Sequence, residues 1–134
     1  MDHWYAYHSD SVMKHSYASV GASQVYLTKR YSFAIGDIVW VVEGDLNRPK
    51  GFALVDCFRC AEVEYPPFHS GYERFKLKIV GRSSLLACEI PLAKMESWFA
   101  TLHADYITKR RSFSLLTREL EIVNGLSRIS GIRF

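Results

Sequence analysis

The chain has 134 residues, of which 49% are apolar and 23% charged, a composition typical of one globular domain rather than of a disordered segment. Residues 108–134 contain six Lys or Arg and two Asp or Glu, a net charge of +4, whereas residues 1–107 have a net charge of −1. An odd number of cysteines (three), no apolar leader and no membrane-length apolar run predict a reducing compartment and no membrane partner. We therefore expect a cytoplasmic protein with a single domain over residues 1–134.

The N-terminal part of the chain predicts two short strands separated by a loop. His3–His8 is rich in aromatic residues, which favour strands. Residues 9–23 are polar and without a clear period, so we expect mainly a loop there. Gln24–Leu27 is the second predicted strand.

The central part of the chain predicts a β-hairpin. Residues 38–42 form a β-branched and aromatic run, residues 43–50 are polar and contain Gly, Asn and Pro, and residues 52–63 are apolar again. Two prolines at 66 and 67 exclude a ladder strand at that point. Residues 74–80 alternate between apolar and basic side chains, which predicts a half-buried strand.

The C-terminal part predicts helices around one further strand. Residues 85–90 are a short strand candidate, and Pro91 begins a segment with helical spacing. The apolar positions of that predicted helix are Leu92, Met95, Phe99, Leu102 and Tyr106. Residues 112–116 predict a strand. Thr117 is then the expected N-cap of a last helix, whose apolar stripe begins at Leu120.

Several short segments occur in an order that resembles a known family. They are residues 35–40 (IGDIVW), 51–55 (GFALV), 64–66 (EYP), 74–80 (RFKLKIV), 90–92 (IPL) and 111–117 (RSFSLLT). This order is similar to that of the EVE domain of the PUA-like superfamily. The resemblance implies an α+β fold, a small mixed or antiparallel β-barrel with flanking helices and an aromatic pocket for a modified base. EVE-like domains resemble the sensing modules of modification-dependent restriction endonucleases, so a fused nuclease domain in a longer protein is one expected arrangement.

A pocket for an extruded base needs flat rings for stacking and polar atoms at the base edge. The candidate rings are those of Tyr5, Tyr7, Tyr31, Phe33 and Trp40; membership in the core is the alternative for each. Glu43 and Asp45 follow the strand that contains Trp40, where a carboxylate would accept a hydrogen bond from a cytosine amino group. A solvated turn is the alternative for both. The chain departs from the usual EVE pattern at Glu43, where the family carries a small polar residue.

Contacts to the phosphate backbone require Lys and Arg around the mouth of such a pocket. The candidates are Lys29, Arg30, Arg48, Lys50, Lys109, Arg110 and Arg111. A solvated surface is the alternative for basic residues of this kind.

Neither a metal site nor a catalytic centre is predicted. Cys57 and Cys60 are three residues apart in a predicted strand, so their thiols point to opposite faces and do not share a metal. We expect no cofactor and no enzyme activity from this chain itself. The predicted function is to read a modified base, 5-methylcytosine or 5-hydroxymethylcytosine in double-stranded DNA, by base flipping. The alternatives are an RNA-binding PUA-like module and a barrel that binds a small molecule or a protein.

Overall fold

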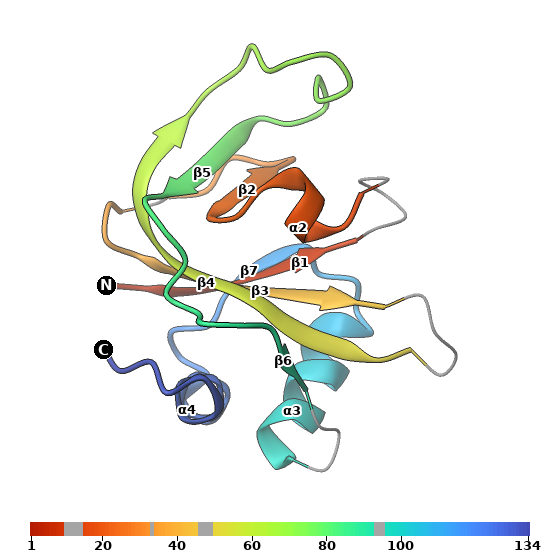
Figure 1. Ribbon diagram of the computed structural model, residues 1–134, viewed down its shortest axis with the longest axis vertical. Coiled ribbons are helices and arrows are strands. Elements are labelled where there is room, and N and C mark those ends of the chain that lie inside the picture. The colour runs from red at the N-terminus through yellow and green to blue at the C-terminus, as the bar shows by residue number, and fades with distance from the viewer. Residues whose placement is uncertain (10–14, 33, 46–49, 93–95) are drawn as a thin grey trace.

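Figure 1 shows the computed structural model of the chain, a mixed β-sheet that curls into a half-barrel and carries a few short helices. The structure describes residues 1–9, 15–32, 34–45, 50–92 and 96–134. A curled mixed sheet with flanking helices confirms the coarse prediction of an α+β, barrel-like fold. No helix within these ranges is long and apolar enough to cross a membrane.

The strands within the described ranges form one sheet. They are β1 (His3–His8), β2 (Gln24–Leu27), β3 (Ile38–Gly44), β4 (Phe52–Glu64), β5 (Leu77–Gly81), β6 (Ile90–Pro91) and β7 (Phe113–Leu115). The helical elements are α2 (Tyr17–Val20), α3 (Ser97–Leu102), the π-helical η1 (His103–Ile107) and α4 (Leu120–Ser130). The strand order is β2-β5-β4-β3-β1-β7, with β6 paired to β4; β1 runs parallel to β3, and the other pairs are antiparallel.

The predicted central hairpin is confirmed as the β3–β4 pair, in which Trp40 lies opposite Cys57. Strand β4 is long: its first part pairs with β3 and β6, and its last part pairs with β5. It therefore carries the curl from one half of the sheet to the other (Figure 1). Residues 38–42 of β3 form an unbroken apolar run and all five are buried, as expected for a strand covered on both faces.

Two hydrophobic cores occupy the two faces of the sheet. One core joins Tyr5, Trp40 and Cys57 to the buried residues of α3, η1 and α4. The other lies inside the curl and contains Trp4 and Cys60. Figure 1 shows the same division, with α3 and α4 below the central strands and α2, β2 and β5 above them. Cys57 and Cys60 belong to different cores, which confirms that their thiols point to opposite faces.

The helix predicted from Pro91 onward begins later than expected. Leu92 is buried but precedes the helix, residues 93–95 lie outside the described residues, and α3 begins at Ser97. Phe99, Leu102 and Tyr106 are buried as the helical spacing predicted. The strand predicted over residues 85–90 is reduced to β6, because most of that segment forms turns.

The prediction of Thr117 as the N-cap of the last helix is wrong. Helix α4 begins at Leu120, and the Leu120 side chain is 65% exposed instead of belonging to the apolar stripe. The Thr117 hydroxyl donates a hydrogen bond to Oδ1 of Asp2 (2.9 Å) and accepts one from the His3 backbone N–H (2.9 Å). Thr117 therefore fixes the start of β1 beside the end of β7 instead of capping the helix.

Asp37, which directly precedes β3, is buried and anchors the N-terminus. Its carboxylate accepts hydrogen bonds from the backbone N–H groups of Asp2 (2.9 Å) and Ala34 (3.2 Å) and from the Trp4 indole (3.1 Å). Burial alone would raise the pKa of Asp37, but these hydrogen bonds outweigh burial and lower the pKa below its usual value.

Candidate functional site

A cleft of about 710 Å³, within the range of ligand-binding pockets, lies among the described residues. Strands β2 and β7, at opposite ends of the sheet order, both line it, together with η1 and the loop that follows it. The cleft thus lies where the half-barrel remains open. Its described lining residues are Tyr7, Ser9, Val25, Tyr26, Leu27, Thr28, Tyr31, Lys50, Phe52, Arg74, Phe75, His103, Ile107, Thr108, Arg110, Arg111, Ser112 and Phe113.

Aromatic rings form much of the cleft wall and are held by contacts with one another. The ring of Tyr31 lies 4.9 Å from that of Phe113, between centroids. On the other wall, the ring of Phe52 packs against those of Tyr7 and His103, with centroid distances of 6.5 and 5.4 Å. Rings supported in this way offer flat apolar surfaces in fixed positions, which is what stacking of a planar ligand requires.

The described lining of the cleft carries positive charge. Lys50, Arg74, Arg110 and Arg111 line it, and none of its described lining residues is Asp or Glu. The Arg111 guanidinium lies 5.3 Å from the centre of the Tyr106 ring, a cation–π contact that orients it. This inventory of charges favours an anionic ligand.

The wall that carries these arginines has unusual backbone geometry. Residues 103–107 form a π-helical turn, and Arg110 has a φ of +55°, in the left-handed region that non-glycine residues rarely adopt. Both features are frequent at functional sites. Here they turn the chain sharply between η1 and β7, so that both Arg110 and Arg111 reach the cleft.

The structure separates the predicted pocket rings into two groups. Tyr7 and Tyr31 line the cleft, whereas Tyr5 (1% exposed) and Trp40 (0% exposed) are core residues. The prediction that Tyr5 and Trp40 line a pocket is therefore wrong. Helices α3 and α4 and the η1 turn cover the middle of this sheet face, where Tyr5 packs against Tyr106. Burial, followed by the neighbouring Tyr7, raises the pKa of Tyr5 far above its usual value.

The predicted acidic readers do not line the cleft either. Oε2 of Glu43 accepts a hydrogen bond from the Tyr17 backbone N–H (2.7 Å) and lies 3.8 Å from Nε2 of His8. Oδ1 of Asp45 accepts a hydrogen bond from the Gly51 backbone N–H (3.0 Å), which links the end of β3 to the start of β4. Both carboxylates thus hold backbone N–H groups, and the turn interpretation fits Asp45.

The predicted basic residues also divide. Lys50, Arg110 and Arg111 line the cleft; Lys29, Arg30 and Lys109 are exposed outside its described lining. Phe33 and Arg48 lie outside the described residues.

Sequence reasoning missed five of the rings in the cleft: Tyr26, Phe52, Phe75, His103 and Phe113. Arg74 and Phe75 begin the alternating segment, which gave some indication of a basic row beside a ring. His103 follows a helix with no pattern that distinguishes it. Among the described residues, no group of His, Cys, Asp or Glu could hold a metal ion.

Comparison with known proteins does not identify the chain, because no protein-family model and no curated protein matches its sequence.

Proposed function

We propose that this chain is an EVE-like, PUA-like reader domain that binds nucleic acid and holds a modified base in the cleft between β2 and β7. The observation that carries the proposal is the cleft itself, which combines supported aromatic rings with four cationic side chains and has no Asp or Glu in its described lining. Rings suit a base, and cations suit the phosphates next to it. The order of sequence segments that resembles the EVE domain supports the same function.

In this mechanism the target nucleotide leaves the stack, at a cost of a few kcal/mol, and its base enters the cleft. Stacking on the rings offsets about 1–3 kcal/mol of that cost. Hydroxyl groups of Tyr7, Thr28, Tyr31 and Ser112 belong to the described lining and can hydrogen-bond the base edge. A hydroxyl both donates and accepts, so it replaces the carboxylate first expected to accept from a cytosine amino group.

The proposal is a binding function, and any cleavage belongs to a nuclease domain fused to the reader in a longer protein. Modified cytosine in double-stranded DNA is the ligand we propose. An RNA target would use the same rings and cations, so RNA of the same sequence belongs among the probes.

The test is binding, at one near-physiological salt concentration, to duplex DNA carrying cytosine, 5-methylcytosine, 5-hydroxymethylcytosine or its glucosylated form. We expect at least about a tenfold preference for one modified duplex, equivalent to 1.4 kcal/mol. Tyr31→Ala should abolish that preference. Tyr65→Ala is the matched control, because Tyr65 is a 62% exposed tyrosine that does not belong to the described cleft lining.

Equal binding to all four duplexes, unaffected by Tyr31→Ala, would contradict the proposal. Preference for the RNA probe would keep the cleft as the site and replace DNA by RNA as the ligand. Trp40→Ala is unsuitable for this test, since Trp40 is a core residue whose removal threatens the fold.

A further inference from the structure

Five rings gather at the edge of the cleft, Tyr26 of β2 and four rings around it. We call them the loop aromatic cluster; its members are Tyr26, Phe68, His69, Tyr72 and Phe75. The Tyr26 ring lies 4.5 Å from the Tyr72 ring and 5.3 Å from the Phe68 ring, between centroids. The rings of His69 and Tyr72 are 4.0 Å apart. All members except Tyr26 come from residues 65–76, the loop between β4 and β5 at the top of Figure 1.

Backbone hydrogen bonds hold this loop in place. The N–H of Tyr72 donates to the carbonyl of His69 (3.1 Å), and the N–H of Phe75 donates to the carbonyl of Tyr72 (3.2 Å). The N–H of Lys76 then donates to the carbonyl of Leu27 in β2 (2.7 Å). The rings are therefore presented on a fixed backbone, so that ordering the loop adds little entropic cost to binding.

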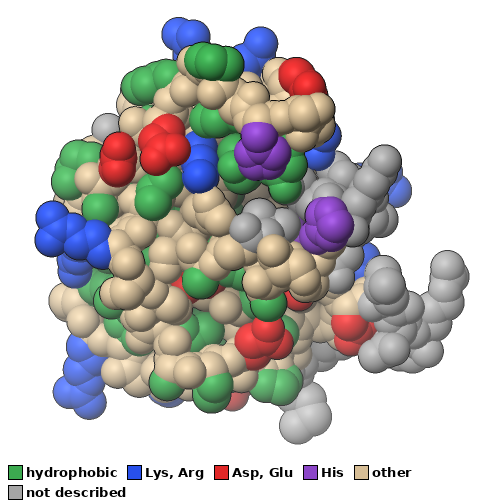
Figure 2. Space-filling model, turned by 45° about the horizontal axis from the view of Figure 1, so that its top comes forward, with side chains coloured by type: hydrophobic (Ala, Val, Ile, Leu, Met, Phe, Trp, Pro, Cys, Tyr) green, Lys and Arg blue, Asp and Glu red, His purple; other side chains and the backbone are tan. Residues whose placement is uncertain are grey.

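The loop aromatic cluster is partly open to solvent and carries cations. His69 is exposed, and Phe68 and Tyr72 are half-buried. The Arg74 guanidinium lies 4.4 Å from the centre of the Phe75 ring, and Nζ of Lys78 lies 5.2 Å from that of Tyr26. Figure 2 shows hydrophobic and His side chains at this upper end of the molecule, with both basic and acidic side chains around them.

The cluster is also continuous with the cleft. Tyr26, Arg74 and Phe75 belong both to the cleft lining and to the cluster with its cations. His69 and Tyr72 therefore lie next to the cleft, within reach of a strand whose nucleotide would occupy it. In proteins that bind single-stranded nucleic acid, bases stack on exposed aromatic rings and neighbouring cations contact the phosphates.

We propose that the loop aromatic cluster is a second nucleic-acid contact, on which one or more unpaired nucleotides flanking the nucleotide in the cleft stack. This inference rests on the proposed function of the cleft. With this second contact, affinity depends on the length of the bound strand and on whether the nucleotides beside the cleft are unpaired. The cleft alone imposes neither requirement.

The test compares two probes, 5-methyl-dCMP and a single-stranded DNA nonamer that carries 5-methylcytosine at its centre. We expect the wild-type chain to bind the nonamer more tightly than the mononucleotide. Tyr72→Ala and His69→Ala should weaken nonamer binding by about fivefold to a hundredfold, the effect of losing one stacked base, and leave mononucleotide binding unchanged. His69→Phe keeps a ring and should retain nonamer binding.

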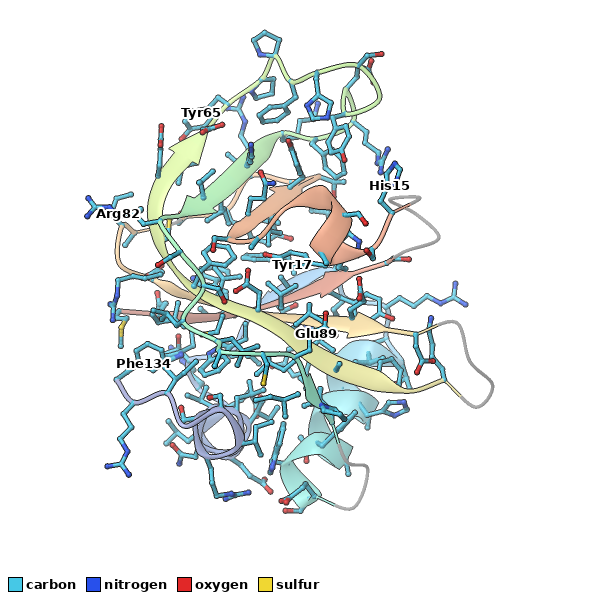
Figure 3. The ribbon with its side chains drawn as sticks, in the orientation of Figure 1. His15, Tyr17, Tyr65, Arg82, Glu89 and Phe134 are labelled. Atoms are coloured by element: carbon cyan, nitrogen blue, oxygen red, sulfur yellow. The ribbon has the colours of Figure 1, made fainter. Side chains whose placement is uncertain are left out.

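Tyr65→Ala is the matched control within the same loop. Tyr65 lies where β4 ends and makes none of the ring contacts described for the cluster, so its removal should change neither affinity (Figure 3). Because His69 is exposed, His69→Ala tests the contact without removing buried packing.

The two proposals fail in different ways. If Tyr31→Ala weakens both probes while His69→Ala and Tyr72→Ala leave nonamer binding unchanged, the cleft stands and the second contact is overturned. If the wild-type chain binds the nonamer no better than the mononucleotide, or does not bind it, the second contact is also overturned. If Tyr31→Ala affects neither probe, the proposed function of the cleft is overturned as well.

Discussion

The indole ring of Trp98 in α3 packs directly against the backbone of Gly125 in α4, where a β-carbon on residue 125 would overlap the ring. Glycine normally weakens the interior of a helix, but here its lack of a side chain lets the two elements approach. We expect Gly125→Ala to lower the free energy of unfolding by about 1–3 kcal/mol, in spite of the better helix propensity of alanine. Urea denaturation measures this change.

Asn124→Ala is the control for that substitution, since Asn124 is exposed on the same helix. It should leave the free energy of unfolding nearly unchanged or raise it slightly. A Gly125→Ala variant as stable as the Asn124→Ala variant would contradict the close Trp98–Gly125 contact.

The buried carboxylate of Asp37 predicts a stability that depends on pH. Its pKa is lowered in the folded state, so its contribution is present above the unfolded pKa, about 3.9, and is lost as the pH falls through the folded value. We expect Asp37→Asn to lower the free energy of unfolding at pH 7 by about 1–3 kcal/mol, because charge-assisted hydrogen bonds are lost. The difference from the wild-type chain should shrink below about pH 4.

Denaturation at several pH values tests this prediction. Asp105→Asn, at an exposed acidic residue of η1, is the control and should change the free energy of unfolding little at any pH. A difference between Asp37→Asn and wild type that grows toward low pH would show that the sign is wrong.

The three thiols should react very differently. Cys57 and Cys60 are buried, and burial raises the pKa of each thiol; the charge of Asp56 adds to the increase at Cys57 and that of Asp37 at Cys60. Cys88 is exposed. Since the thiolate is the reactive species, we expect a thiol reagent to modify Cys88 rapidly in the folded protein and the other two only after denaturation. Cys88→Ser should abolish the fast phase; a fast phase that persists would indicate that one buried site opens.

Arg111 should contribute to the salt dependence of DNA binding. If it contacts one phosphate, Arg111→Ala reduces the slope of log K against log salt concentration by about 1 and weakens all duplexes alike. Arg82→Ala is the control, because Arg82 is exposed at the end of β5 and does not belong to the described cleft lining (Figure 3). Equal slopes for wild type and Arg111→Ala would show that Arg111 makes no phosphate contact.

The elements predicted correctly are those whose pattern is local. The β-branched run of β3 and the aromatic run of β1 indicate strands from a few neighbouring residues. The role of Thr117 could not be predicted from its neighbouring residues. Its hydroxyl is bound by Asp2 and by the backbone of His3, more than a hundred positions earlier, and that contact competes with helix capping.

The residues of the cleft could not be predicted from local sequence patterns either. Tyr5 and Tyr7 point to the same face of β1, as the alternation of a strand requires, yet one is a core residue and the other lines the cleft. The difference is set by where the helical cover ends, which the spacing within β1 does not encode. Tyr26, Phe52 and Phe113 come from three strands that meet only in the folded sheet, so no sequence window brings them together.

The pairing of the first strand with the last has a consequence for how the protein is made. Strand β1 lies between β3 and β7, and Trp4 is opposite Leu115. Contacts between such distant residues form slowly, because a long loop must close before they contribute stability. While the chain is synthesised, one edge of β1 stays unpaired until residues 113–115 leave the ribosome. We therefore expect the cleft, which needs Phe113 on one wall and Tyr7 beside it, to be completed late in folding.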